Sequence, residues 1–283
     1  MILRKMLRKD IADNWEQYAN PEFLEEHNID LESYGAQNMV QFFEVRNMLA
    51  TVTAAAPYCR ELVLEFYCNL TEAVKDPRFV NYGKVYMREQ IFQFSPAVIN
   101  GFLWTSSVDD AILPSLDVMT SVITGGQVTT FPAHPKNLPA AKFTSLYSVL
   151  HKTSVKTWTP SGNSTVLTKH QALVLYAIGI GANFNYGRLV FDTVMAFAYC
   201  AQPTLKLPYP SLIYSITISQ EIEKDGDESL TEPGEVLKIA PALLRRNRKF
   251  DLPWSESGAV EDVVEYVANT PLSIAIFVPP SAA

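Results

Sequence analysis

A chain of 283 residues with 48% hydrophobic and 19% charged residues has the composition of a globular protein, which excludes disorder throughout its length. Its net charge of −7 excludes a protein-wide positive field for binding phosphates, so any nucleic-acid contact needs a local basic cluster. Three cysteines, Cys59, Cys68 and Cys200, are too few for a disulfide framework and indicate buried free thiols in an intracellular protein.

The first hundred residues show helical periodicity, which is interrupted once. Apolar residues recur at helical spacing in 37–52 and, more strongly, in 58–73. Residues 79–94 lose that period and alternate aromatic and β-branched residues, which predicts a short β-hairpin. Ser95 and Pro96 then predict a helix start, because serine caps the first amides and proline has no amide to leave unpaired.

The middle of the chain combines loops with apolar helices. Residues 106–140 are rich in glycine and proline, which predicts a loop-rich excursion and the main internal boundary. Helical signals resume in 141–152, after the capping residue Thr168, and in the apolar stretch 186–201. Residues 210–220 are apolar, with helix and strand both open.

Charge dominates the C-terminal part of the sequence. Residues 221–235 hold seven acids against one lysine, which predicts a solvated loop. Residues 242–250 end a predicted helix with a basic cluster, and 259–269 predict one more amphipathic helix. The cluster consists of Arg245, Arg246, Arg248 and Lys249.

These elements predict a mainly α-helical globular domain with a small β-hairpin as a minor α+β component. We expect an N-terminal helical extension at 1–36, a helical domain at 37–220, and a segment at 221–283 with the acidic loop, the basic helix end and a C-terminal helix. No stretch reaches the ~18 uninterrupted apolar residues of a membrane span, and no signal-peptide-like apolar run follows the basic start. An intracellular location follows, with nucleus and cytoplasm both open.

The patterns that carry metal, phosphate or nucleophilic chemistry do not appear. The four histidines have no metal-ligand spacing, and no G-x-S-x-G sequence occurs. The glycines in 179–187 follow a helical stretch rather than a strand, so they predict a helix C-cap and an inter-helix turn. The histidines are His27, His134, His151 and His170.

Few acids in the middle of the chain could serve a two-metal site. Asp192 has Arg188 four residues before it, which predicts a structural ion pair. The others are Asp109, Asp110 and Asp117, of which the first two fall in a predicted loop. The sequence therefore predicts no catalytic residue, no metal site and no cofactor.

Four ordered blocks resemble a known family. RELVLEFYCNLTEA (60–73) resembles the signature lV-x-EFY-x-NL of the putative plant transposon protein domain. KVYMREQIFQFSPAVINGFL (84–103) is similar to its V-x-VRG-x-x-v-x-fSP-x-aIN-x-fL element. LTKHQALVLYAIGIGANFNYGRLVFDTV (167–194) and LPYPSLIYSI (207–216) resemble two later blocks of the same domain. The resemblance covers roughly residues 40 to 220.

The resemblance implies an origin in a plant mobile element but no assigned reaction. Its matching positions are mainly hydrophobic or turn-forming, which is typical of residues that determine a fold. The sequence departs from the family at Glu89 and Gln90, where a glycine usually follows the arginine, and at Gln171, where arginine is frequent.

The sequence therefore predicts a non-enzymatic structural or interaction module with a protein partner, derived from a plant transposable element. We expect an aromatic groove near the hairpin, with Arg88 and Asn100 as its polar members; the alternative is that Arg88 is solvated and Asn100 binds nearby backbone. The remaining groove residues are Tyr82, Tyr86, Phe92, Phe94 and Trp104. The alternative function is nucleic-acid binding or processing through the basic cluster at 245–249.

Overall fold

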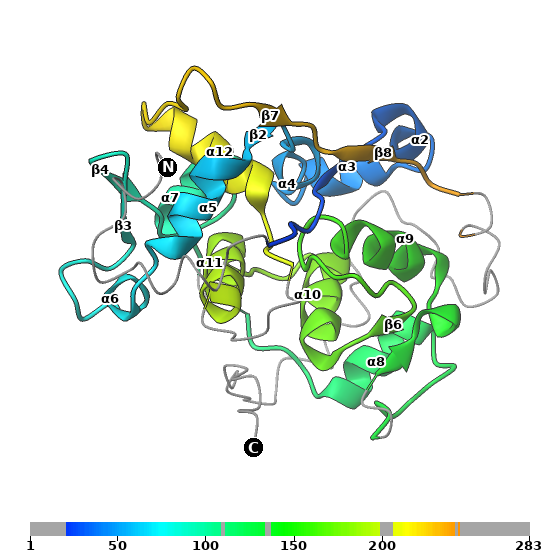
Figure 1. Ribbon diagram of the computed structural model, residues 1–283. Coiled ribbons are helices and arrows are strands. Elements are labelled where there is room, and N and C mark those ends of the chain that lie inside the picture. The colour runs from blue at the N-terminus through cyan, green and yellow to red at the C-terminus, as the bar shows by residue number, and fades with distance from the viewer. Residues whose placement is uncertain (1–20, 109–110, 134–136, 199–205, 241–242, 244–283) are drawn as a thin grey trace. The chain divides into compact units, whose positions relative to one another are not determined.

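The computed structural model describes residues 21–108, 111–133, 137–198 and 206–240 together with Leu243 (Figure 1). Within these residues it contains eleven α-helices and only two-stranded sheets, so the chain is rich in helix without being all-helical. The described helices include none that is long and apolar enough to cross a bilayer.

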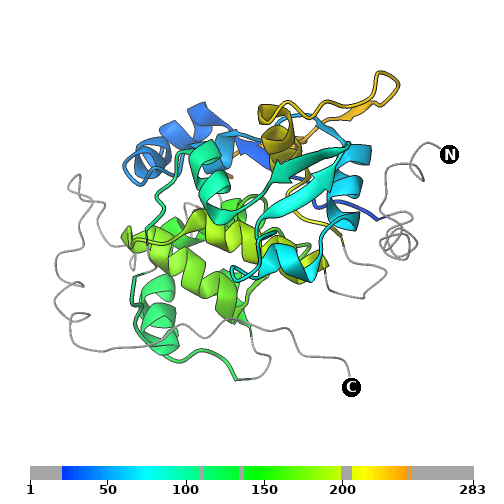
Figure 2. The same cartoon turned by 90° about the vertical axis from the view of Figure 1, so that its left-hand side faces the viewer.

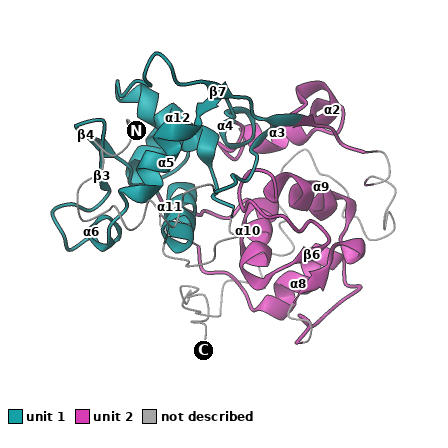
Figure 3. Ribbon diagram, in the orientation of Figure 1, with its two compact units in different colours: residues 1–28, 50–107, 185–235 teal, residues 29–49, 108–184, 236–283 magenta. Residues whose placement is uncertain are grey.

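The chain forms two compact units, each assembled from three segments (Figure 3). Unit 1 comprises residues 1–28, 50–107 and 185–235, and unit 2 comprises 29–49, 108–184 and 236–283. The division of the sequence into 1–36, 37–220 and 221–283 stays a prediction. Of its first segment, the described residues hold strand β1 (His27–Ile29), which pairs with β8 (Gly234–Leu237), and helix α2 (Leu31–Gly35).

Unit 1 combines a β-hairpin with helices. In chain order its elements are α4 (Ala50–Thr53), β2 (Tyr58–Cys59), α5 (Arg60–Cys68), α6 (Glu72–Lys75), β3 (Lys84–Met87), β4 (Gln90–Gln93), α7 (Pro96–Leu103), α11 (Tyr186–Ala198), α12 (Pro210–Ser219) and β7 (Leu230–Thr231). Helix α5 packs against α12 and β3, and α7 packs against α11.

The predicted hairpin is confirmed as the antiparallel pair β3–β4, whose two arrows lie side by side in Figure 2. Val85 faces Phe92 on its buried side, and Tyr86 faces the exposed Ile91 on its outer side. The buried side joins an aromatic cluster in which Phe66 of α5 lies 5.8 Å from Phe92 and 4.8 Å from Phe94 between ring centroids. Edge-to-face contacts of this kind stabilise a core beyond the area that they bury.

The helix signals read from the sequence are confirmed where they are local. Ser95 Oγ accepts from the Val98 amide at 3.4 Å, with Pro96 as the first residue of α7. In unit 2, Thr168 and Gln171 form a reciprocal capping box at the start of α10 (Lys169–Ile180). Gly181 ends α10 in the left-handed region with φ of 69°, the C-cap predicted there.

Unit 2 is built mainly from helices. Its other elements are α2, α3 (Met39–Glu44), α8 (Leu116–Thr124), β5 (Leu138–Pro139), the 3-10 helix η2 (Ala140–Lys142), α9 (Ser145–Ser154) and β6 (Val166–Leu167). Helix α10 packs against α8 and α9, and the Phe43 ring lies edge-on to the buried Trp158 at 5.7 Å. Arg46 lies over the Phe42 ring and donates from Nε to the Ile178 carbonyl at 3.0 Å, which satisfies one of the last carbonyls of α10.

Two local expectations are corrected by the structure. The excursion predicted at 106–140 contains α8, whose ends are fixed by the N-cap Ser115 and by Gly125 in the left-handed region. The helix expected at 37–52 is two helices, α3 and α4, with Asn47 at a positive φ between them. Residues 210–220, left open between helix and strand, form α12. The helices expected at 242–250 and 259–269 lie outside the described residues, apart from Leu243.

In unit 1, Glu26 caps the start of α12 with a carboxylate that accepts from the amides of Ser211 at 2.6 Å and Leu212 at 3.2 Å. Burial raises the pKa of Glu26 to about 7 against the lowering effect of these two bonds. Because the folded state then holds its proton more tightly than the unfolded state, stability is greatest below the unfolded pKa and falls as the pH rises to 7. We expect a loss of about 1 to 3 kcal/mol between pH 4.5 and 7, and urea unfolding of Glu26→Gln should lack it. An unchanged pH profile in Glu26→Gln would contradict this assignment.

In unit 2, the buried His151 predicts the opposite pH dependence. Its Nε2 lies without a hydrogen-bond partner among the described residues, and burial lowers the pKa of its imidazole to about 4, although a bond with the Val166 backbone acts in the other direction. The unfolded state therefore binds the proton first, and stability falls as the pH drops from 6.5 to 4. We expect a loss of about 3 kcal/mol at pH 4, which His151→Gln should remove in acid titrations followed by circular dichroism. Equal acid sensitivity of both chains would show that another group is responsible.

Candidate site around Arg88

The most concentrated group of charges in the described part of unit 1 begins with Glu65, in the middle of α5. The helix runs RELVLEFYC, and its apolar residues turn toward the core on both sides of this glutamate. The Glu65 side chain is 0% exposed. A carboxylate at such a depth requires a compensating cation and hydrogen bonds, because burial alone strongly disfavours the charge.

Arg88 supplies that cation from the turn of the hairpin. Arg88 and Glu89 both have positive φ, 45° and 62°, as the two central residues of a tight hairpin loop between Met87 and Gln90. Such loops favour glycine or asparagine, and other residues pay on the order of 1 kcal/mol each for this conformation. The Arg88 amide donates to Glu65 Oε1 at 2.8 Å, which offsets part of this cost by tying the turn to α5.

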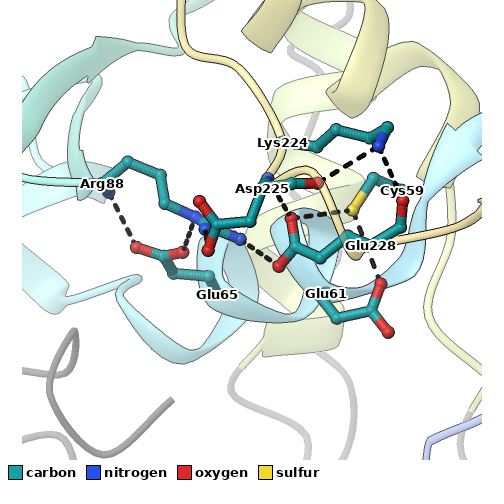
Figure 4. A network of polar contacts seen from close by, with 7 residues as sticks. All are labelled: Cys59, Glu61, Glu65, Arg88, Lys224, Asp225 and Glu228. Atoms are coloured by element: carbon teal, nitrogen blue, oxygen red, sulfur yellow. Dashed lines mark hydrogen bonds and ion pairs between the residues drawn. The ribbon is translucent and has the colours of Figure 1, made fainter. Parts of the chain in front are cut away.

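The Arg88 guanidinium contacts three carboxylates from two different parts of the chain (Figure 4). Its Nε donates to Glu65 Oε2 at 2.9 Å, its Nη1 lies 2.6 Å from Asp225 Oδ2, and its Nη2 donates to Glu228 Oε1. The Arg88 side chain is only 9% exposed. The expectation of a solvated Arg88 on the hairpin is therefore wrong, because the arginine is needed to neutralise Glu65.

The electrostatics of the cluster follow from its depth. Burial raises the pKa of Glu65, although the amide and guanidinium of Arg88 act in the other direction. Burial also lowers the pKa of Arg88, but the contacts with Glu228, Glu65 and Asp225 outweigh it, so the arginine holds its proton more firmly than usual. Planar N–H donors that match carboxylates make arginine suited to such a shared site.

The solvated loop predicted at 221–235 is found for most of the stretch but not for two of its acids. The sequence predicted a solvated loop, but Asp225 and Glu228 turn inward to Arg88. Lys224 Nζ donates to the backbone carbonyls of Asp225 and Glu228, which holds the loop in shape. Arg88, which is distant in sequence, therefore binds two carboxylates for which the sequence predicted exposure to solvent.

Cys59, the N-cap residue of α5, closes the far side of the cluster. Its Sγ donates to Glu61 Oε2 at 3.5 Å and to Glu228 Oε2 at 3.6 Å. Burial, reinforced by the charges of Glu228 and Glu61, raises the pKa of the Cys59 thiol to about 12, and burial raises that of Cys68 to about 12 as well. Both thiols are therefore protonated at neutral pH, and a protonated thiol is a poor nucleophile and metal ligand.

Asn100 forms a second polar centre in unit 1. Its Oδ1 accepts from the Gly187 amide and from Thr105 Oγ1, both at 2.7 Å. Its Nδ2 donates to Asn185 Oδ1 at 2.8 Å and to Ser107 Oγ at 3.2 Å. Asn100 is buried, and these bonds fix α7 against the start of α11. The alternative in which Asn100 bonds nearby backbone holds for the Gly187 amide, whereas its other three partners are side chains.

The residues predicted for an aromatic groove lie in three different settings. Phe92 and Phe94 are fully buried in the core, Tyr82 packs edge-on against Phe191, and Tyr86 lies half-buried on the outer side of the hairpin. Trp104, in contrast, is 82% exposed at the end of α7. The buried phenylalanines are therefore closed off from solvent by the protein itself.

Other candidates from the sequence are placed individually. Asp192 forms the predicted i, i+4 pair with Arg188 at 2.6 Å, and Asp117 accepts from the Phe131 amide. Among the described residues, no group of three or more His, Cys, Asp or Glu side chains is placed to hold a metal ion. The basic cluster, Cys200, His134, Asp109 and Asp110 lie outside the described residues.

The sequence did not predict that Glu65, Asp225 and Glu228 belong to one site. Only Glu65 carried a usable signal, since a lone acid inside the apolar run LVLEFYC predicts a buried charge with a distant partner. Nothing distinguished Asp225 and Glu228 from the other acids of 221–235.

The comparisons agree with the resemblance found in the sequence. The family described as putative plant retrotransposon-related domain matches residues 44–223, which include α5, the hairpin and α7 to α12. No match was found among curated proteins or among solved structures. The match covers most of the chain and places it in a lineage derived from plant transposable elements. The chain belongs to the plant retrotransposon-related domain family.

Proposed function

We propose that the chain is a non-enzymatic structural or interaction module. The observation that supports this most strongly is the charge cluster of unit 1, in which the carboxylates of Glu65, Asp225 and Glu228 are all bound to Arg88. A catalytic centre would instead hold at least one such group ready for a substrate. The protonated thiols of Cys59 and Cys68 support the same conclusion.

The surface of unit 1 offers apolar side chains suited to a protein partner. Ile91 stands exposed on the outer side of the hairpin, opposite Tyr86, and Trp104 is exposed at the end of α7. Large apolar and aromatic side chains are enriched at the centres of protein interfaces.

The second candidate function is nucleic-acid binding, supported by the four basic residues within 245–249. Fluorescence anisotropy with labelled duplex and single-stranded DNA at about 50 mM salt, where phosphate contacts are strong, separates the two. The interaction module predicts no binding by the wild-type chain. Binding that disappears in the variant Arg245→Ala/Arg246→Ala/Arg248→Ala/Lys249→Ala would favour the second candidate, whereas Lys84→Ala, which removes a cation of the hairpin, serves as the matched control.

A further inference from the structure

Residues 221–235, here named the strap, are attached to unit 1 largely through polar contacts. Asp225 and Glu228 bind Arg88, and the strap strand β7 pairs antiparallel with β2, with Tyr58 opposite Thr231 and Cys59 opposite Leu230. Both residues of β7 are exposed, while Ile222 at the start of the strap is buried. The strap therefore has one apolar anchor, followed by a stretch held by charge and backbone pairing.

The carboxylates around Arg88 differ in how deeply they are buried. Glu65 is fully enclosed in α5, whereas on the strap Asp225 is 45% exposed and Glu228 is 13% exposed. Ion pairs with an exposed partner are weak and are screened by salt. The strap also holds seven acids against one lysine, and their mutual repulsion opposes its closed position. Arg88 and Glu65 thus form the fixed part of the cluster. The strap acids form the part that other carboxylates can replace.

The surface beneath the strap has the chemistry of a peptide-binding site. It offers the Nη1 and Nη2 donors of Arg88, which match carboxylates, beside the backbone edge of β2, which pairs with an extended strand. Strand addition at a sheet edge, combined with a charged side-chain contact, is a recurrent mode of peptide recognition. The strap itself shows which ligand fits, because it is an extended acidic segment bound in this way.

We propose that the strap is a built-in ligand of this site and that an extended acidic peptide from a partner protein can displace it. The inference rests on the proposed function as an interaction module and names the chemistry of its partner. In the free chain the strap occupies the site at the high effective concentration of a tethered ligand, so a partner must compete with it.

Opening of the strap can be measured through Cys59, which lies beneath it. Cys68→Ala/Cys200→Ala leaves Cys59 as the sole thiol, and Cys59→Ala/Cys200→Ala leaves Cys68 as a reporter of general loosening. Asp225→Asn removes a carboxylate bound to Arg88, whereas Glu61→Gln removes a carboxylate bound to the thiol. We expect Asp225→Asn to accelerate labelling of Cys59 by a thiol reagent about two- to fivefold, the effect of losing an ion pair whose carboxylate is partly exposed. Glu61→Gln should have a smaller effect, and Cys68 labelling should stay slow.

Two results of the labelling experiment would overturn the proposal. Equal acceleration by Glu61→Gln would mean that local charge alone controls the Cys59 thiol. Equal acceleration at Cys68 would mean that the whole unit loosens. Either result would show that the strap does not open independently of the rest of unit 1.

Binding of a peptide in trans completes the test. A fluorescent peptide copying residues 222–232 should bind Asp225→Asn/Glu228→Gln about tenfold more tightly than wild type, since the double variant weakens its own strap. The same peptide carrying Asp225→Asn and Glu228→Gln should not bind, and added salt should weaken the acidic peptide. Equal binding to both chains, or equal binding of both peptides, would overturn the acidic-peptide site. Either outcome would leave the proposed function intact, because the exposed side of the hairpin does not depend on the strap.

Discussion

Replacing Arg88 with leucine is expected to lower the free energy of unfolding by about 3 to 5 kcal/mol, the cost of leaving a buried charge without its partner. Glu65 would remain enclosed in α5, and the tight turn at Arg88 and Glu89 would lose its side-chain anchor. Urea unfolding of wild-type and variant chains measures this loss. The loss should shrink in acid, because protonation of Glu65 removes the buried charge that causes it.

Arg78→Leu provides the matched control for Arg88. Arg78 also pairs with a carboxylate, that of Asp76, but its side chain is 87% exposed. Exposed ion pairs contribute little to stability because solvent screens them, so this variant should remain close to wild type. Arg88→Lys should be intermediate, because it keeps the charge and loses the planar donors. Equal stability of Arg88→Leu and Arg78→Leu would show that the cluster does not stabilise the fold.

The second large effect is expected from Gly187→Ala, at the seam of α7 and α11. A Cβ atom at Gly187 would lie 2.2 Å from the Pro96 carbonyl oxygen and 2.8 Å from the Asn100 side chain. The helices would have to separate, which would also break the bond from the Gly187 amide to Asn100. We expect a loss of about 3 kcal/mol or more, measured as a lowered midpoint of urea unfolding.

Gly101→Ala separates this steric effect from the general effect of alanine in a helix. Gly101 lies in the neighbouring helix α7, is exposed, and a Cβ atom there meets nothing within 4 Å. Alanine at this position should stabilise the chain by about 0.5 to 1 kcal/mol. If both variants change stability in the same direction, the close packing of α7 on α11 does not explain why position 187 needs glycine.

The parts of the fold that were predictable from sequence depend on local chemistry. The predicted features of this kind are the Ser95–Pro96 start of α7, the Thr168 cap of α10 and the alternating hairpin strands. Each depends on residues close together in sequence. Helix α8 was missed because the nearby glycines and prolines suggested a loop, although Gly125 serves there as a C-cap.

The features that could not be predicted from sequence depend on contacts between residues that are distant in the chain. Glu65, Arg88 and Glu228 come from three separate segments, and no spacing rule brings them together. The sequence pattern predicts Gly187 as a turn residue together with Gly181, but Gly187 lies inside α11 and allows α7 to pack closely against it. The outward Tyr86 and the buried Phe92 follow from strand alternation, whereas the complete enclosure of Phe92 and Phe94 depends on Phe66 and Phe191.

A double-mutant cycle between Arg88→Leu and Glu228→Gln tests most directly whether these charges join the strap to the hairpin. Unfolding free energies of the wild type, the two single variants and the double variant give the coupling energy. We predict a favourable coupling of about 1 kcal/mol or more, as contacting partners show. Additive effects, with a coupling near zero, would contradict it.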